Sequence, residues 1–79
     1  MTFPVRRYLD LRGTPCPINF VRCRLALESL EPNDFLHVDI DKGEPQLMVI
    51  PGLRREGHRV EITLQKNSWI RLKVICGAG

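Results

Sequence analysis

Long apolar runs are missing from this sequence. No stretch reaches the roughly 18 residues that a membrane-spanning helix needs, and the first residues lack the charged-then-apolar order of a secretory signal peptide. We therefore expect a cytoplasmic protein with no membrane association. Internal repeats and low-complexity tracts are also missing, so the 79 residues are expected to form one domain over positions 1–79.

Cysteine and histidine are scarce. The three cysteines, Cys16, Cys23 and Cys76, form no Cys-x-x-Cys pair, which argues against a disulfide framework and a structural zinc site. His37 and His58 have no cysteine or carboxylate at metal-ligand spacing, and neither suggests the Cys–His pair of a cysteine protease. Glycine-rich phosphate-binding loops are missing as well. We expect no metal ion and no organic cofactor.

A strong excess of charge of one sign is also lacking. Twelve Lys and Arg residues against nine Asp and Glu residues give a net charge of +3. The basic residues cluster only at positions 6–7, 22–24 and 54–55. So mild a charge permits direct binding to RNA or to an acidic partner, but it favours neither.

Strand and helix patterns alternate along the chain. We predict strands over residues 7–11, 35–40, 59–66 and 69–75, and helices over 17–30 and from Glu44 towards Arg55, with Gly57 as the stop. Asn67-Ser68 is a turn candidate that makes the last two strands an antiparallel hairpin. Two helices are too few to cover both faces of a four-stranded sheet. The order β-α-β-α-β-β therefore predicts an α/β (α+β) two-layer sandwich, with a mixed four-stranded sheet and both helices on one face.

Apolar periodicity predicts which side chains of each element share a face. In the first helix this face carries Phe20, Cys23, Leu27 and Leu30, and in the strands it carries Leu36, Val38 and Ile40, then Val60, Ile62 and Leu64. Pro51 lies inside the second helical pattern. Because proline removes a helical hydrogen bond, we expect it to kink that helix or to split it.

The segment Asp10-Leu-Arg-Gly13-Thr-Pro-Cys16-Pro17-Ile-Asn19 joins the first strand to the first helix. Pro17 suits the first helical position. This places the Cys16 thiol at the first turn, where backbone N–H groups and the helix dipole favour the thiolate. The alternative is a thiol packed as a small apolar group, and the residues alone leave both open. We assign Gly13 and Asp10 to the turn, for unusual backbone angles and for local hydrogen bonds.

The two other cysteines suggest packing more than chemistry. Cys23 falls on the core face of the first helix, and we expect it to be buried. Cys76 stands at a strand end, where we expect a surface thiol. A resolving role for Cys76 towards Cys16 is a less favoured alternative, because nothing in the sequence places the two together.

Three apolar residues, Ile18, Val21 and Leu25, fall on the side of the first helix opposite its core face. Scattered apolar residues on a surface are normal. A contiguous stripe beside a reactive thiol, flanked by Arg22 and Arg24, is instead typical of a partner-docking surface. Both interpretations stay open at this point.

The pattern Asp10-x-x-Gly13-x-x-Cys16-Pro17, after a short strand and before an amphipathic helix, resembles the TusA/SirA-like sulfur-carrier family. The likeness extends from about residue 7 to residue 75 and includes the Ile50-Pro51-Gly52 step. It implies a two-layer sandwich and a Cys-Pro-x-Pro motif whose cysteine accepts sulfane sulfur as a persulfide. The donor would be a cysteine desulfurase or rhodanese-like protein, and an acceptor protein would follow, for example in tRNA thiolation or cofactor synthesis.

Asn19 is where this sequence departs from the family motif, which here reads Cys-Pro-Ile-Asn. We expect the backbone N–H at this position to lack a helical partner, so either residue suits the fold. The amide of Asn19 would lie near the thiol and tune the persulfide. The alternative is that this residue marks a divergent member of the family with a different partner. Two alternative functions on the same fold are an RNA- or protein-binding module using Arg22, Arg24, Arg54 and Arg55, and a redox-sensing regulator in which Cys16 oxidises.

Overall fold

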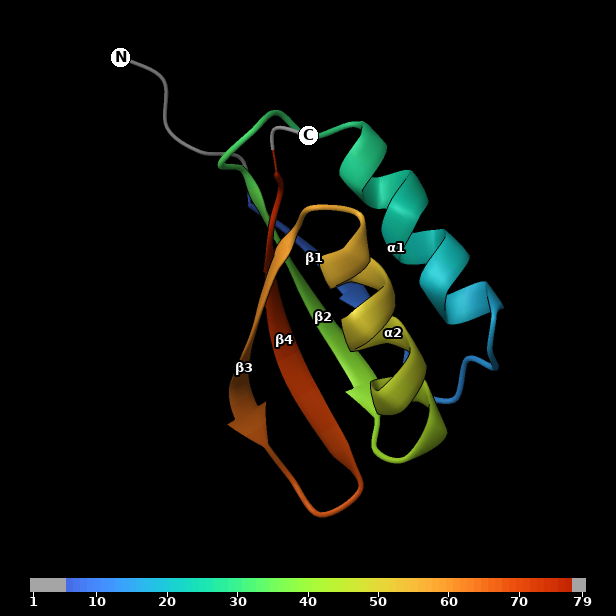
Figure 1. The fold of residues 1–79 in the computed structure, drawn as a ribbon. Coiled ribbons are helices and arrows are strands. Elements are labelled where there is room, and N and C mark those ends of the chain that lie inside the picture. Colours follow the sequence, from blue (N-terminus) through green and yellow to red (C-terminus); the bar gives the residue numbers. More distant parts are fainter. Residues whose placement is uncertain (1–5, 78–79) are drawn as a thin grey trace.

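The computed structural model describes residues 6–77 and shows the predicted order of elements (Figure 1). The elements are β1 (Arg6–Asp10), α1 (Ile18–Glu28), β2 (Phe35–Asp41), α2 (Glu44–Arg55), β3 (Arg59–Gln65) and β4 (Trp69–Ile75). Their ends lie within one or two residues of those expected from the pattern, which is the usual uncertainty at element ends. Neither helix in this part of the chain has the length and apolar character needed to cross a lipid bilayer.

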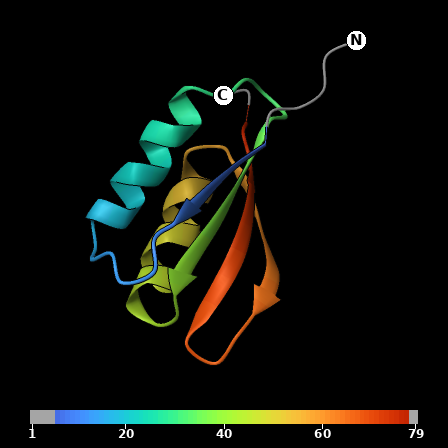
Figure 2. The ribbon, with the colours of Figure 1, turned by 180° about the vertical axis from the view of Figure 1, so that it is seen from behind.

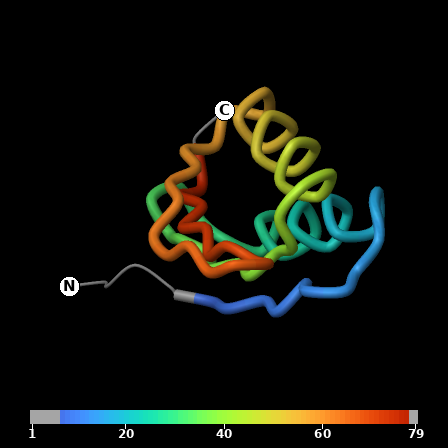
Figure 3. Tube along the Cα trace, turned by 90° about the horizontal axis from the view of Figure 1, so that it is seen from below, coloured from blue at the N-terminus to red at the C-terminus, as the bar shows by residue number. Residues whose placement is uncertain are grey.

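The four strands form one mixed sheet in the order β1-β2-β4-β3. β1 runs parallel to β2, and the β2–β4 and β4–β3 pairs are antiparallel. Figure 1 shows α2 in front of the strands, and Figure 2 shows the strands in front of α2. Seen from below, both helices lie on the same side of the sheet (Figure 3). The predicted two-layer architecture is therefore confirmed.

The core lies between the helices and one face of the sheet. The alternate residues of the two central strands are all fully buried: Leu36, Val38, Ile40, Ile70, Leu72 and Val74. From the helices, Cys23, Leu27, Val49 and Leu53 complete this layer. Each fully buried aliphatic side chain contributes about 1.5–3 kcal/mol of transfer free energy, so this layer is the main source of stability.

β3 departs from the predicted alternation. Val60 is buried, but Ile62 is 41% exposed. Ile62 pairs with Leu72 and Leu64 pairs with Arg71, so Thr63 is an extra residue at a β-bulge. The bulge puts Leu64 on the helix-free side with Arg71. Our prediction of a single apolar face through Leu64 was therefore wrong.

α2 passes through Pro51 as one helix, which excludes the split, one of the two outcomes expected at this proline. Pro51 is exposed, whereas Ile50 and Leu53 on either side are buried and hold both halves of the helix on the sheet. The helix ends as predicted at Gly57, which has a φ of +93°. The Gly57 N–H donates to the Arg54 carbonyl and the His58 N–H donates to the Leu53 carbonyl, the pattern of a Schellman motif.

The helix-free face of the sheet contains a buried carboxylate that the sequence pattern did not predict. Asp39 on β2 is fully buried and accepts hydrogen bonds from the Tyr8 hydroxyl on β1 and from two nitrogens of the Arg71 guanidinium on β4. Burial alone would raise the pKa of Asp39, but hydrogen bonds from Arg71 and Tyr8 outweigh it and lower this pKa below its ordinary value. The three side chains tie three strands together.

Candidate functional site

The loop between β1 and α1 is fixed to the end of β2. The Leu11 N–H donates to the Asp39 carbonyl at 2.8 Å, and the Gly13 N–H donates to a carboxylate oxygen of Asp41 at 2.8 Å. Gly13 has a φ of +77°, a conformation that glycine adopts with little strain. The sequence predicted this glycine as a turn residue, and its position confirms that expectation.

Asp10 shapes the same loop through Arg12. Its carboxylate accepts hydrogen bonds from the Arg12 backbone N–H at 3.2 Å and from the Arg12 guanidinium at 2.8 and 2.9 Å. The side-chain hydrogen bonds from Arg12 lower the pKa of Asp10 to about 2. Arg12 in turn lies over the Trp69 ring, 4.6 Å from its centroid. Asp10 therefore makes the local hydrogen bonds that we expected of it.

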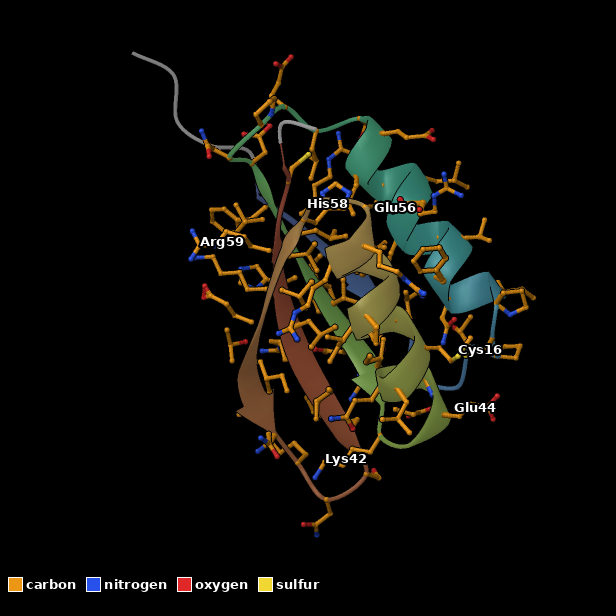
Figure 4. The ribbon with its side chains drawn as sticks, in the orientation of Figure 1. Cys16, Lys42, Glu44, Glu56, His58 and Arg59 are labelled. Atoms are coloured by element: carbon orange, nitrogen blue, oxygen red, sulfur yellow. The ribbon has the colours of Figure 1, made fainter. Side chains whose placement is uncertain are left out.

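Cys16 lies directly before α1, where the chain turns into the helix (Figure 4). Pro17 is the N-cap residue of α1, one position before the expected one, and the Val21 N–H donates to its carbonyl at 3.0 Å. The Cys16–Pro17 peptide bond is cis. The Cys16 side chain is partly exposed, so the thiol is accessible to a reaction partner.

Asn19 is the polar side chain in contact with the Cys16 thiol. It is fully buried, and its Nδ2 donates a hydrogen bond to Cys16 Sγ at 3.2 Å. Its Oδ1 accepts from the Phe20 backbone N–H at 2.7 Å. The Asn19 backbone N–H also has a partner, the Pro15 carbonyl at 3.1 Å. Pro15 lies before α1, so this N–H has no partner within the helix, as expected, but it is not unpaired, because the chain already turns before the helix begins.

A crevice of about 140 Å³ opens beside the thiol, between the start of α1 and the exposed side of α2. It is lined by Cys16, Pro17, Asn19 and Phe20 from the α1 side and by Met48, Gly52 and Arg55 from α2. A Cβ atom on Gly52 would lie 2.7 Å from the Phe20 ring, so this glycine lets the ring pack against the helix. Sequence reasoning missed the three α2 residues, although a glycine within a helix is itself a sign of close approach.

Both helices also expose apolar side chains on their outer surface. Ile18, Val21 and Leu25 are 52%, 45% and 60% exposed, as predicted for the stripe opposite the core. Arg22 beside them is exposed, and Arg24 forms an ion pair with Glu56 at 3.1 Å. On α2, Leu47 and Met48 are 71% and 55% exposed and extend the apolar surface beyond the predicted residues.

The other two thiols are buried. Cys23 is fully buried, as expected, and burial raises its pKa to about 12. Cys76 is only 7% exposed, so our expectation of a surface thiol was wrong. Its backbone N–H donates to the Asp34 carbonyl and its Sγ contacts the Leu27 and Leu30 carbonyls, which covers it with the end of α1.

Cys76 therefore lies against the C-terminal end of α1, whereas Cys16 lies at its N-terminal end. The helix between them has a rise of about 15 Å, which excludes a resolving role for Cys76 towards Cys16 in this structure. Among residues 6–77, no group of three His, Cys, Asp or Glu side chains is arranged to hold a metal ion.

Known proteins share this sequence pattern and fold. The sequence model of the family described as sulfurtransferase TusA matches residues 7–75. A "Putative sulfur carrier protein" of Archaeoglobus fulgidus is 40% identical over 53 residues, which is 66% of this chain and 59% of the relative. Another protein with that description, from Thermotoga maritima, is 31% identical over 58 residues, 73% of each chain.

The crystal structure of a SirA-like protein from Desulfitobacterium hafniense superposes with a TM-score of 0.77 at 22% identity, covering 90% of this chain and 97% of that one. This match shows that the two proteins share a fold. The family match is more specific, because it extends from β1 to the end of β4 and includes the Cys16 loop. The chain therefore belongs to the TusA sulfurtransferase family.

Proposed function

We propose that this chain is a sulfur carrier that accepts sulfane sulfur as a persulfide on Cys16 and passes it to a partner protein. The observation that carries the proposal is the position of Cys16. It is the one cysteine of the three that is partly exposed, and it lies at the start of a helix with an amide N–H directed at its sulfur. Family membership and the names of the two relatives support the same function.

The proposed loading step needs no cofactor. The Cys16 thiolate attacks the outer sulfur of a donor persulfide, R–S–SH. A bond forms between Cys16 Sγ and that sulfur, the donor S–S bond breaks, and its electron pair leaves with the donor as a thiolate. The product is Cys16–S–SH, with no net oxidation. Delivery repeats the exchange, with Cys16 as the leaving thiolate and an acceptor thiolate as the nucleophile.

The start of α1 favours both anionic forms of Cys16, the thiolate before loading and the persulfide anion after it. The positive end of the helix dipole stabilises negative charge placed there, although the Asn19 and Phe20 backbone N–H groups already have partners. A persulfide is more acidic than a thiol, so the same field favours the loaded form. Pro17 at the N-cap, Gly13 and Asp10 hold the loop that presents the thiol to this field.

The exposed apolar stripe of Ile18, Val21 and Leu25, with Arg22 beside it, is the proposed docking surface for donor and acceptor. A cysteine desulfurase or a rhodanese-like protein is the proposed donor. The acceptor would act in a route such as tRNA thiolation or cofactor synthesis. Met48 and Leu47 continue this surface on the other side of the crevice.

Mass spectrometry tests the assignment. After incubation with a cysteine desulfurase and cysteine, the intact protein is expected to gain one sulfur atom, and peptide mapping should place it on Cys16. Cys16→Ser should gain none, whereas Cys76→Ser should load like the wild type. Equal loading of the wild type and Cys16→Ser would refute the role of this residue.

The RNA-binding alternative has less support from the geometry. Arg24 is paired with Glu56, and the Arg54 guanidinium donates to the Val60 carbonyl at 3.0 Å. Two of the four arginines that this function would use therefore make contacts within the protein. The accessible thiol and the family match both favour sulfur transfer.

A further inference from the structure

The orientation of the Asn19 side chain is set by its neighbours. The Phe20 backbone N–H can only donate, so the Asn19 atom that faces it at 2.7 Å must be the amide oxygen. The amide nitrogen then faces Cys16 Sγ at 3.2 Å. Because the whole side chain is buried, water does not compete for either contact. The backbone thus directs an N–H donor at the sulfur atom.

We propose that the Asn19 amide stabilises negative charge on the inner sulfur of Cys16 and thereby favours the delivery step of sulfur transfer. A neutral thiol sulfur is a weak acceptor, so an amide donor at this distance stabilises a thiolate more than a thiol. Proline, which the family motif has at this position, offers no side-chain donor. The substitution in this chain therefore changes the chemistry at the sulfur.

The two steps of transfer respond differently to such a donor. When sulfur is loaded, stabilising the Cys16 thiolate increases its population but lowers its intrinsic nucleophilicity, and the two effects offset each other. When sulfur is delivered, Cys16 Sγ is the leaving atom, and a more stable thiolate leaves faster. The role in delivery rests on the proposed function, whereas the contact with the thiolate does not.

Other charged groups on this side of the molecule are common to every variant. Arg55 from α2 lines the crevice that opens at Cys16, and Glu44 at the start of α2 lies on the same side of the molecule (Figure 4). Asp41 at the end of β2 accepts the Gly13 N–H. Substitutions at Asn19 leave these three charges in place. A change in thiol behaviour therefore reports on the amide when the new residue is neutral.

The test compares Asn19→Asp and Asn19→Leu with the wild type. Asn19→Asp keeps an oxygen for the Phe20 N–H but turns a carboxylate oxygen towards the sulfur, and Asn19→Leu removes the donor at similar volume. Iodoacetamide alkylation of Cys16 is measured against pH, with the adduct assigned by peptide mass. The pH of half-maximal rate should rise by about one unit in Asn19→Leu. It should rise further in Asn19→Asp, because the added carboxylate also repels the thiolate.

Delivery is measured separately. The protein is loaded with inorganic polysulfide, and the transfer of its sulfur to dithiothreitol is followed. Both variants should deliver about three-fold more slowly than the wild type. Asn67→Asp, in the exposed turn before β4, is the matched control and should alter neither measurement.

A purely structural role for Asn19 predicts a different result. Asn19→Leu, which adds no charge, would then keep the wild-type alkylation profile. That profile in a folded Asn19→Leu protein would overturn the proposal. Asn19→Pro, which restores the family residue, must show the same upward shift as Asn19→Leu. The two proposals can fail separately. If desulfurase does not load the wild type but the variants still show the shifted alkylation profile, the proposed function is refuted and the contact between the amide and the thiolate is supported.

Discussion

Cys16 and Cys23 are about two helical turns apart along the chain, yet they are chemically different thiols. Cys16 is partly exposed beside an amide donor, whereas Cys23 is surrounded by core side chains that exclude water. The sequence placed both on one helical pattern, and the periodicity correctly predicted burial for Cys23. The contrast comes from their positions: Cys16 precedes α1 at the edge of the core, whereas Cys23 lies within the helix on the face that packs against the sheet.

We therefore expect thiol labelling to be selective in the native protein. Burial raises the pKa of Cys23 to about 12, so at pH 8 only about one Cys23 thiol in ten thousand is ionised. Burial also raises the pKa of Cys76, with help from Asp34 and Glu31. Iodoacetamide at pH 8 should modify Cys16 alone, and all three cysteines should react in denaturant. Equal labelling of Cys23 and Cys16 in the native protein, read by peptide mass, would contradict this structure.

Cys76 shows where reasoning from residues fails. Its place at the end of a strand, next to a glycine-rich terminus, indicated a surface thiol. In the structure a backbone hydrogen bond to Asp34 places it under the end of α1. Such a contact joins segments that are far apart in the sequence, and no local pattern reports it.

At the scale of elements, α1 and α2 meet where Gly52 faces Phe20. Alanine has a higher helix propensity than glycine by about 1 kcal/mol, so propensity alone predicts that Gly52→Ala stabilises the protein. The added Cβ would instead lie 2.7 Å from the Phe20 ring. We expect a net loss of about 1 kcal/mol in the free energy of unfolding, measured by urea denaturation. Gln46→Ala on the same helix is the control, and a Gly52→Ala variant more stable than the wild type would refute the packing argument.

The strands are joined on their helix-free face by Asp39 and its partners. Removing the Arg71 guanidinium leaves the Asp39 carboxylate buried without its main donor, so Arg71→Ala should lose about 3 kcal/mol of stability at pH 7. The loss arises from an unpaired buried charge and not from the ion pair alone. Urea denaturation at several pH values provides the measurement.

The dependence on pH has a definite sign. In the wild type the pKa of Asp39 is lowered on folding, so its contribution is present above about pH 4 and is lost as the pH falls further. In Arg71→Ala, burial raises the Asp39 pKa, and the variant gains stability as this carboxyl becomes protonated. The two stability curves should approach each other towards pH 3. Parallel curves would show that Asp39 is not the group responsible.

Most of the elements were predictable because their apolar residues follow one period from end to end. β2 is a clear case, since Leu36, Val38 and Ile40 alternate with polar residues and all are buried. One failure has a physical cause beyond the pattern, because the bulge at Thr63 changes the face of one residue of β3. Of the two outcomes expected at Pro51, a kink or a split, packing on both sides of the proline excludes the split and keeps α2 in one piece.

The candidate site was predictable only in part, because local sequence patterns do not report contacts between distant segments. The loop residues and the exposed stripe on α1 follow from local sequence. Met48 and Arg55 reach the thiol from another helix, so only the tertiary structure brings them to the crevice. The direction of the Asn19 amide likewise depends on the Phe20 N–H, which no sequence pattern specifies.

For the whole molecule, docking and chemistry are expected to be separable. A carboxylate placed on the exposed stripe should hinder a protein donor but not a small one. We expect Val21→Asp to lower desulfurase-driven loading of Cys16 by about tenfold, while loading by inorganic polysulfide is unchanged. Ile62→Asp, at an exposed apolar residue of β3, the edge strand opposite β1, serves as the control. Equal losses with both donors would assign Val21 to the fold or the chemistry and not to docking.

The register of the strands decides how this protein can be joined to another. β1 begins and β4 ends beside Phe35, since Arg6 and Ile75 are both aligned with that residue. β1 is about 17 Å long, and Cys16 follows its other end. A fluorescent label or a second domain attached ahead of β1 or after β4 therefore starts at the end away from the sulfur. Fusion at either end should leave the thiol free to react, which makes the domain suitable for tethering experiments.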